Sequence, residues 1–97
     1  MCKTEIFANA LKIVSQETEI PGETILGNSR KEEVVDARTI LVTILLEMGL
    51  YPEQIATYLN RTPAGIRHLA GIFPSRKREK LLQINLQLIR KKLESNS

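Results

Sequence analysis

The amino-acid sequence predicts an all-α protein, a compact bundle of five or six helices that contains a helix-turn-helix. Aromatic residues make up only 4% of the 97 residues, and there is no Trp. The core must therefore be built from Leu, Ile, Val and Ala, which suits packed helices, whereas strands are enriched in β-branched and aromatic residues. Apolar residues also recur at helical spacing in most segments of the chain. A chain of this length is expected to form one domain, residues 1–97, with a modest core.

The first helix is expected over residues 4–17, which place apolar side chains on one face. Thr4 is a candidate cap for its start. Pro21 and Gly27 then punctuate the chain as turn residues around a short apolar pair, Ile25-Leu26. We expect this pair to form one helical turn that packs back on the core.

A central helix is expected over residues 30–48, because its apolar residues cover most of the helix circumference. Gly49 is suited to end it, since a residue free to take a positive φ is wanted there. The last helix is expected over residues 75–94 and is basic. Its apolar stripe is interpreted as core, with the seam of a homodimer as the alternative. This stripe consists of Leu82, Leu86, Ile89 and Leu93.

Two short helices over about residues 52–72 are joined by a tight turn, and this pattern predicts a helix-turn-helix. Asn60 suits the turn because Asn tolerates a left-handed conformation. Thr62 can cap the second helix, and Pro63 can occupy its first position, where the missing N–H costs nothing. The alternative is an ordinary helical hairpin in a bundle. In either case the two helices are expected to pack on each other through Ile55, Ala56, Leu59, Ile66 and Leu69.

The second of these helices, about residues 63–71, is the predicted recognition helix for the major groove of duplex DNA. Its outward positions are expected to be Ala64, Gly65, Arg67 and His68. The small residues would allow close approach to a groove, and Arg67 could donate a bidentate pair to guanine, worth about 1–3 kcal/mol of discrimination. The alternative for Arg67 is a solvated surface arginine, and for His68 a packing or capping role.

Phosphate contacts are expected around the same turn. Thr62 and the N–H groups that begin the recognition helix suit a phosphate, and Tyr58 and Arg61 are further candidates. The charge distribution also favours a polyanionic partner. The net charge is +3, but residues 1–53 carry 5 basic and 9 acidic side chains, whereas residues 54–97 carry 9 basic and 2 acidic ones. The alternative is a solvated face that aids solubility.

A second basic patch is predicted at the start of the last helix. Cations at this end oppose the helix macrodipole, which indicates that they serve a polyanion, although a solvated face is the simpler account. The patch consists of Arg76, Lys77, Arg78 and Lys80.

One long stretch, residues 27–69, resembles the C-terminal DNA-binding domain of the bacterial replication initiator DnaA, a helix-turn-helix domain with a Trp-repressor-like fold. It reads "GNSRKEEVVDARTILVTILLEMGLYPEQIATYLNRTPAGIRHL". The family shows "G-K-S-R-K-R-x-x-V-x-A-R", then a long apolar helix, then "I-G-x-x-F-G-G-R-D-H-T-T-V-x-H-A". The resemblance covers about residues 5–72. The matching positions are Ser29-Arg30-Lys31, Val35, Ala37-Arg38, Ile55-Ala56, Arg61, Ile66 and His68.

The resemblance implies roles for several basic residues. In the family the basic loop grips phosphates and the "R-D-H-T-T" segment reads the major groove. Carried across, Arg30, Lys31 and Arg38 would be backbone contacts or nearby supports, and Arg61 would be a contact at the mouth of the recognition helix. The sequence departs from the family at Glu32, where a loop Arg is usual, and at 62–65, where "T-P-A-G" replaces "D-H-T-T". We therefore expect an altered DNA specificity, or none.

Catalytic and membrane functions find little support. The chain has no Walker loop "G-x-x-x-x-G-K-[ST]", hence no ATPase module, and no nucleophile–base pairing or carboxylate dyad, so an enzyme is not expected. With one Cys (Cys2) and one His (His68), neither a zinc site nor another cofactor is expected. The most apolar stretch, residues 39–50, is too short to span a bilayer, and no signal peptide is recognisable. A cytoplasmic protein that does not enter membranes is expected.

The leading hypothesis is therefore duplex DNA binding by a stand-alone, bacterial initiator-like domain in replication control or transcription regulation. The alternative is a protein–protein interaction module on the same scaffold that has lost DNA binding. The acidic residues Glu32 and Glu33 and the missing "D-H-T-T" segment motivate this alternative.

Overall fold

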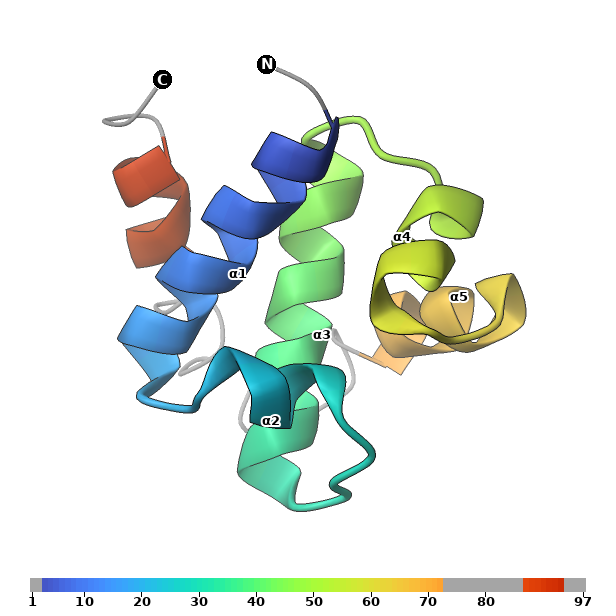
Figure 1. Ribbon diagram of the computed structural model, residues 1–97, viewed down its shortest axis with the longest axis horizontal. Coiled ribbons are helices and arrows are strands. Elements are labelled where there is room, and N and C mark those ends of the chain that lie inside the picture. The colour runs from blue at the N-terminus through green and yellow to red at the C-terminus, as the bar shows by residue number, and fades with distance from the viewer. Residues whose placement is uncertain (1–2, 73–86, 94–97) are drawn as a thin grey trace.

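The computed structural model describes residues 3–72 and 87–93, and all regular structure within these ranges is helical (Figure 1). The predicted all-α bundle is thereby confirmed. Residues 87–93 form a further helical segment near the C-terminus. The labelled helices are α1 (Lys3–Thr18), α2 (Gly22–Leu26), α3 (Glu32–Glu47), α4 (Pro52–Leu59) and α5 (Pro63–Ile72).

Helix α3 is the centre of the bundle. It contacts α1, α2, α4 and α5, and Figure 1 shows it standing between α1 on one side and the α4–α5 pair on the other. Ten of its 16 residues are buried, as the apolar pattern around its circumference predicts. The short apolar pair predicted as one helical turn is α2, and its Ile25 is fully buried in the same core.

Two of the helices end in the same hydrogen-bonding motif, and both ends were predicted. After α3, Gly49 takes a φ of 96°, and the Leu50 N–H donates to the Leu45 carbonyl at 3.1 Å. After α4, Asn60 is left-handed, and the Arg61 N–H donates to the Ala56 carbonyl at 2.9 Å. In this Schellman arrangement a left-handed residue lets the chain turn away while the last carbonyls stay satisfied.

The ends of α1 differ from expectation. Thr4 is not the cap, because α1 already includes Lys3, and the Thr4 hydroxyl instead lies 3.1 Å from the Tyr58 hydroxyl. At the other end Glu19 takes a φ of 59°, which the sequence did not indicate. The Ser15 hydroxyl donates to the Ile20 carbonyl at 2.7 Å and so holds the chain as it leaves the helix.

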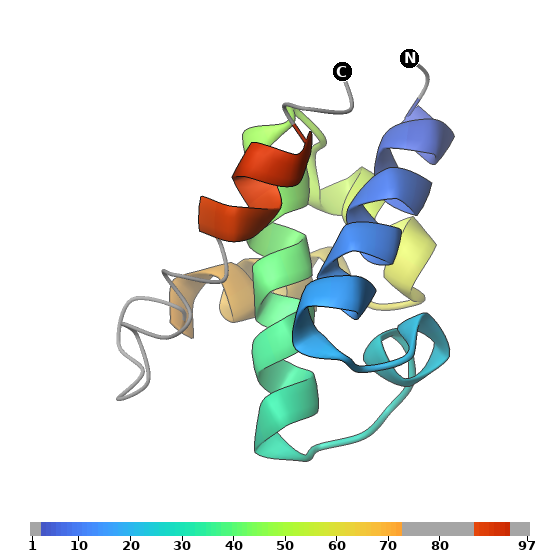
Figure 2. The same ribbon diagram turned by 90° about the vertical axis from the view of Figure 1, so that its left-hand side faces the viewer.

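Of the predicted last helix, only residues 87–93 are described; Leu82 and Leu86 of the apolar stripe lie outside the described residues. Ile89 is fully buried in the common core and Leu93 packs against it, so this part of the stripe is core. In Figure 2 the segment lies in front of the upper part of α3, and in Figure 1 it lies on the side of α1 away from the α4–α5 pair. Ion pairs join Arg90 to Glu47 at the end of α3 and Lys92 to Glu17 of α1.

Candidate nucleic-acid interface

The turn between α4 and α5 is built by the residues that the sequence singled out. Pro52 and Pro63 begin the two helices, and Asn60 has φ 55° and ψ 48°. The Gly65 N–H donates to the Thr62 hydroxyl oxygen at 3.1 Å, which is the predicted cap. A Cβ at Gly65 would lie 3.3 Å from that oxygen, so the cap itself favours a small residue at position 65.

The two helices pack through the apolar face that the sequence predicts, since Ile55, Ala56, Leu59, Ile66 and Leu69 all belong to the buried core. The opposite side of α5 is open to solvent. Thr62, Ala64, Arg67 and His68 are exposed, whereas Gly65 is half-buried. The structure therefore turns outward the residues expected on the reading face of the second helix, apart from the half-buried Gly65.

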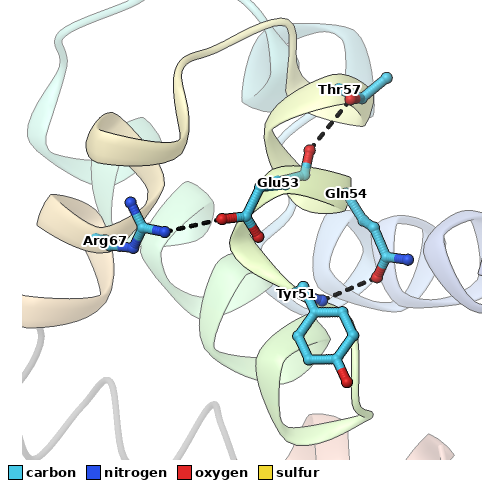
Figure 3. A network of polar contacts seen from close by, with 5 residues as sticks. All are labelled: Tyr51, Glu53, Gln54, Thr57 and Arg67. Atoms are coloured by element: carbon cyan, nitrogen blue, oxygen red, sulfur yellow. Dashed lines mark hydrogen bonds and ion pairs between the residues drawn. The ribbon is translucent and has the colours of Figure 1, made fainter.

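Arg67 nevertheless has a partner within the α4–α5 pair. Its Nη2 lies 2.8 Å from Oε1 of Glu53 in the first turn of α4, as Figure 3 shows. Both side chains are exposed, by 60% and 61%, so solvent screens the pair. Nearby, the Tyr51 N–H donates to Oε1 of Gln54 at 2.9 Å and closes the start of α4. The Glu53–Arg67 pair cannot be read from the sequence, because it joins two different helices.

Arg38 is not on the surface. It is only 4% exposed, and its guanidinium donates from Nε to the Ile25 carbonyl at 2.9 Å. Its Nη2 donates to the carbonyls of Gly27 and Ser29, at 2.8 and 3.3 Å. Burial, and then the neighbouring charge of Arg61, lower the pKa of Arg38. Of the two roles that the resemblance allowed, phosphate contact and nearby support, this placement leaves only support.

Arg61 is half-buried and faces the same loop. Its Nη2 donates to the Gly27 carbonyl at 2.9 Å, so two guanidinium groups share one carbonyl oxygen. This bond brings the α4–α5 turn beside the segment between α2 and α3, residues 27–31, which we call the basic loop. Arg61 thus connects two surfaces that are far apart in the sequence.

The basic loop presents two cations to solvent. Arg30 and Lys31 are both exposed, and no ion pair joins either of them to another described residue. The Lys31 N–H lies 3.4 Å from the Ser29 hydroxyl oxygen, and Lys31 leads directly into α3. Glu32 and Glu33 follow in the first turn of α3 and are also exposed, so this surface carries both signs of charge.

Tyr58 faces α1 and not the basic loop. Its ring stacks on Phe7, with centroids 4.7 Å apart and an interplanar angle of 11°, and its hydroxyl pairs with Thr4. This contact ties α4 to α1 and leaves Tyr58 outside the surface formed by the other candidates. The predicted second basic patch, Arg76, Lys77, Arg78 and Lys80, lies outside the described residues.

The structure therefore brings one set of candidates together around the α4–α5 turn. We define the candidate interface as the exposed residues Arg30 and Lys31 of the basic loop together with Thr62, Ala64, Arg67 and His68 of the turn and α5. Arg38 and Arg61 lie behind the loop, and Tyr58 lies elsewhere.

Comparisons of the chain with family models, with curated proteins and with solved structures gave no match. The resemblance to the DnaA domain accordingly rests on the sequence motifs alone. Among the described helices none has the length and apolarity needed to cross a membrane. Nor do residues 3–72 and 87–93 contain a cluster of His, Cys, Asp or Glu side chains that could hold a metal ion.

Proposed function

We propose that this protein binds duplex DNA through the helix-turn-helix formed by α4 and α5, with α5 as the recognition helix in the major groove. The observation that carries the proposal is the capped, outward-facing α5 with the basic loop held beside its start by the Arg61–Gly27 hydrogen bond. Helix-turn-helix proteins contact base edges with the first residues of the second helix, which is the part of α5 that lies next to the loop.

Each residue of the candidate interface has a role in this proposal. Because the Thr62 oxygen accepts from Gly65, its hydroxyl proton remains available to donate to a phosphate. Arg30 and Lys31 neutralise further phosphates. Ala64 permits close approach of the α5 backbone, and Arg67 donates to a base edge, with His68 following it on the same exposed surface.

The pair with Glu53 does not prevent this role of Arg67. An exposed ion pair contributes about 0–1 kcal/mol, whereas a bidentate contact between arginine and guanine contributes about 1–3 kcal/mol of discrimination. When α5 lies in the major groove, it is therefore favourable for Arg67 to leave the Glu53 carboxylate and to bind a base edge instead. We place the protein in the bacterial cytoplasm, in replication control or transcription regulation, on the support of the sequence resemblance to DnaA.

The proposal is tested by fluorescence anisotropy of a labelled random-sequence duplex at two salt concentrations, with a duplex carrying the initiator's recognition box in parallel. Binding should weaken with salt, with a slope of about 0.9 for each phosphate contact in a plot of log affinity against log salt. A variant with both Arg30→Ala and Lys31→Ala, which we call the loop variant, should lower the slope. Lys12→Ala, an exposed cation on α1, is the matched control and should leave the slope unchanged. A flat titration of the native chain at low salt would overturn the proposal.

The second candidate function, a protein-interaction module on the same scaffold, is favoured by a specific observation. Glu32 and Glu33 directly follow Lys31 of the basic loop, and Glu53 already pairs with Arg67. In that case the same titration stays flat, because the acidic side chains offset the cations at a DNA surface. The box duplex and the random duplex then behave alike.

A further inference from the structure

The Gly27 carbonyl is the point where two arginines from different parts of the chain meet. Arg38 reaches it from α3 and Arg61 reaches it from the α4–α5 turn, with donor–acceptor distances of 2.8 and 2.9 Å. A hydrogen bond from a charged donor is roughly twice as strong as one between neutral groups. The two bonds therefore oppose the repulsion between the guanidinium charges, which contributes to the lowered pKa of Arg38.

The first of these bonds belongs to a set that already connects the basic loop to α3. Arg38 alone bonds to the carbonyls of Ile25, Gly27 and Ser29, and so fixes the path of the chain from α2 to the start of the loop. The bond from Arg61 adds a connection of another kind, because it joins the loop to a residue 34 positions later in the sequence. Its consequence is that a shift of the loop relative to the start of α5 would break this hydrogen bond.

The geometry points to Arg61 as a positioning residue: it ties the α4–α5 turn to the basic loop, so that Arg30 and Lys31 meet the DNA backbone in fixed register with α5. This inference rests on the proposed function and changes the role of Arg61, which the resemblance assigned to direct contact. Its Nη2 is engaged by Gly27, and its Nε is buried. Holding two contact surfaces in their bound arrangement reduces the ordering cost of binding.

The inference is tested by combining Arg61→Met with the loop variant in a double-mutant cycle, read out as DNA affinity and its salt slope. The loop variant alone should lower the slope by about 1.8, that is, about 0.9 for each lost phosphate contact. Arg61→Met alone should lower both the slope and the affinity, because the loop cations lose their register. In the loop-variant background, however, Arg61→Met should change affinity by no more than about twofold, since nothing remains for it to position. A further loss of about 0.9 in slope in that background would show a direct phosphate contact and overturn the inference.

A second measurement needs no DNA and separates this inference from the proposed function. Hydrogen exchange of the amides at residues 27–31 should be faster in Arg61→Met than in the native chain. Arg67→Met is the matched control, since Arg67 is an arginine of the same helix-turn-helix whose partner is Glu53 and not the loop, and it should leave these amides unchanged. If the hydrogen-exchange rates of residues 27–31 are unchanged in Arg61→Met, Arg61 does not hold the basic loop and the inference is overturned. If exchange is faster in Arg61→Met but the native chain binds no DNA, Arg61 does hold the basic loop, and only the proposed role in DNA binding is rejected.

Discussion

At the scale of single residues, Glu53 is the partner that Arg67 has to release before it can bind DNA. The carboxylate lies 2.8 Å from the guanidinium in the structure, and both groups are largely exposed. In the proposed complex Glu53 would stand close to the phosphate backbone, where a second negative charge is unfavourable. Its two effects, neutralising Arg67 and repelling DNA, act in the same direction.

We therefore predict that Glu53→Gln raises DNA affinity several-fold and makes it more salt-dependent. The change should cost less than about 1 kcal/mol of folding stability, because the pair is solvent-exposed. Anisotropy titrations measure the first effect and urea denaturation the second. Glu5→Gln, an exposed carboxylate in the first turn of α1, is the control and should leave DNA affinity unchanged. Weaker binding by Glu53→Gln would mean that the carboxylate orients Arg67 for the groove.

The tertiary partners of individual side chains cannot be read from a local stretch of sequence. The helix-terminal roles of Asn60, Thr62 and Pro63 depend on neighbouring residues only, and a short stretch of sequence contains all the information that they require. Arg38 illustrates the opposite case, since its three carbonyl partners lie 9 to 13 residues away, in α2 and in the basic loop. A buried arginine in a central helix has the same sequence signature as an exposed one at that position.

At the scale of helices, the chain's turns away from α1, α3 and α4 each use a left-handed residue, but only two of the three were foreseen. Gly49 and Asn60 are residue types with a known tolerance for positive φ. Glu19 is not, and the same backbone conformation is strained there by its Cβ. The hydrogen bond from Ser15 to the Ile20 carbonyl and the packing of Ile20 on the core hold the chain in this conformation.

Replacing that residue should relieve the strain. We predict that Glu19→Gly raises the free energy of unfolding by about 0.5–1 kcal/mol. Glycine adopts a positive φ without steric cost, and this gain exceeds the loss that comes from the larger entropy of glycine in the unfolded chain. Gln16→Gly, at an exposed position inside α1, is the matched control and should instead lower stability by about 1 kcal/mol. Urea denaturation followed by circular dichroism measures both. A loss of stability in Glu19→Gly would contradict the left-handed conformation of residue 19.

At the scale of the whole molecule, the bundle is organised around α3. Helix α1 packs on α3, and the C-terminal segment 87–93 is joined to it by an ion pair. This pair is formed by Arg90 and Glu47, and a second pair joins Lys92 of the segment to Glu17 of α1. The opposite side of α3 carries the α4–α5 pair, so the candidate interface is supported by a core to which both ends of the chain contribute (Figures 1 and 2). The apolar stripe alone left open whether this segment belongs to the core or to a dimer seam.

Burial of Ile89 gives a direct test of this arrangement. Its side chain is fully buried in the common core, whereas its neighbour Leu88 is 46% exposed. Ile89→Ala should therefore lower the free energy of unfolding by about 2–5 kcal/mol, from lost apolar burial and the cavity left behind. Leu88→Ala removes the same number of atoms from the same helical segment and should cost well under half as much.

Urea denaturation of both variants and of the native chain measures these losses. Each chain is expected to unfold in a single, cooperative transition. A domain of this kind has only about 5–15 kcal/mol of stability in total, so the loss in Ile89→Ala should be evident as a large shift of the midpoint. Equal costs for the two variants would mean that the segment 87–93 contributes little to the core. A cost in Leu88→Ala that grows with protein concentration would indicate that its exposed side is covered by a second copy of the chain, because stability that depends on association depends on protomer concentration.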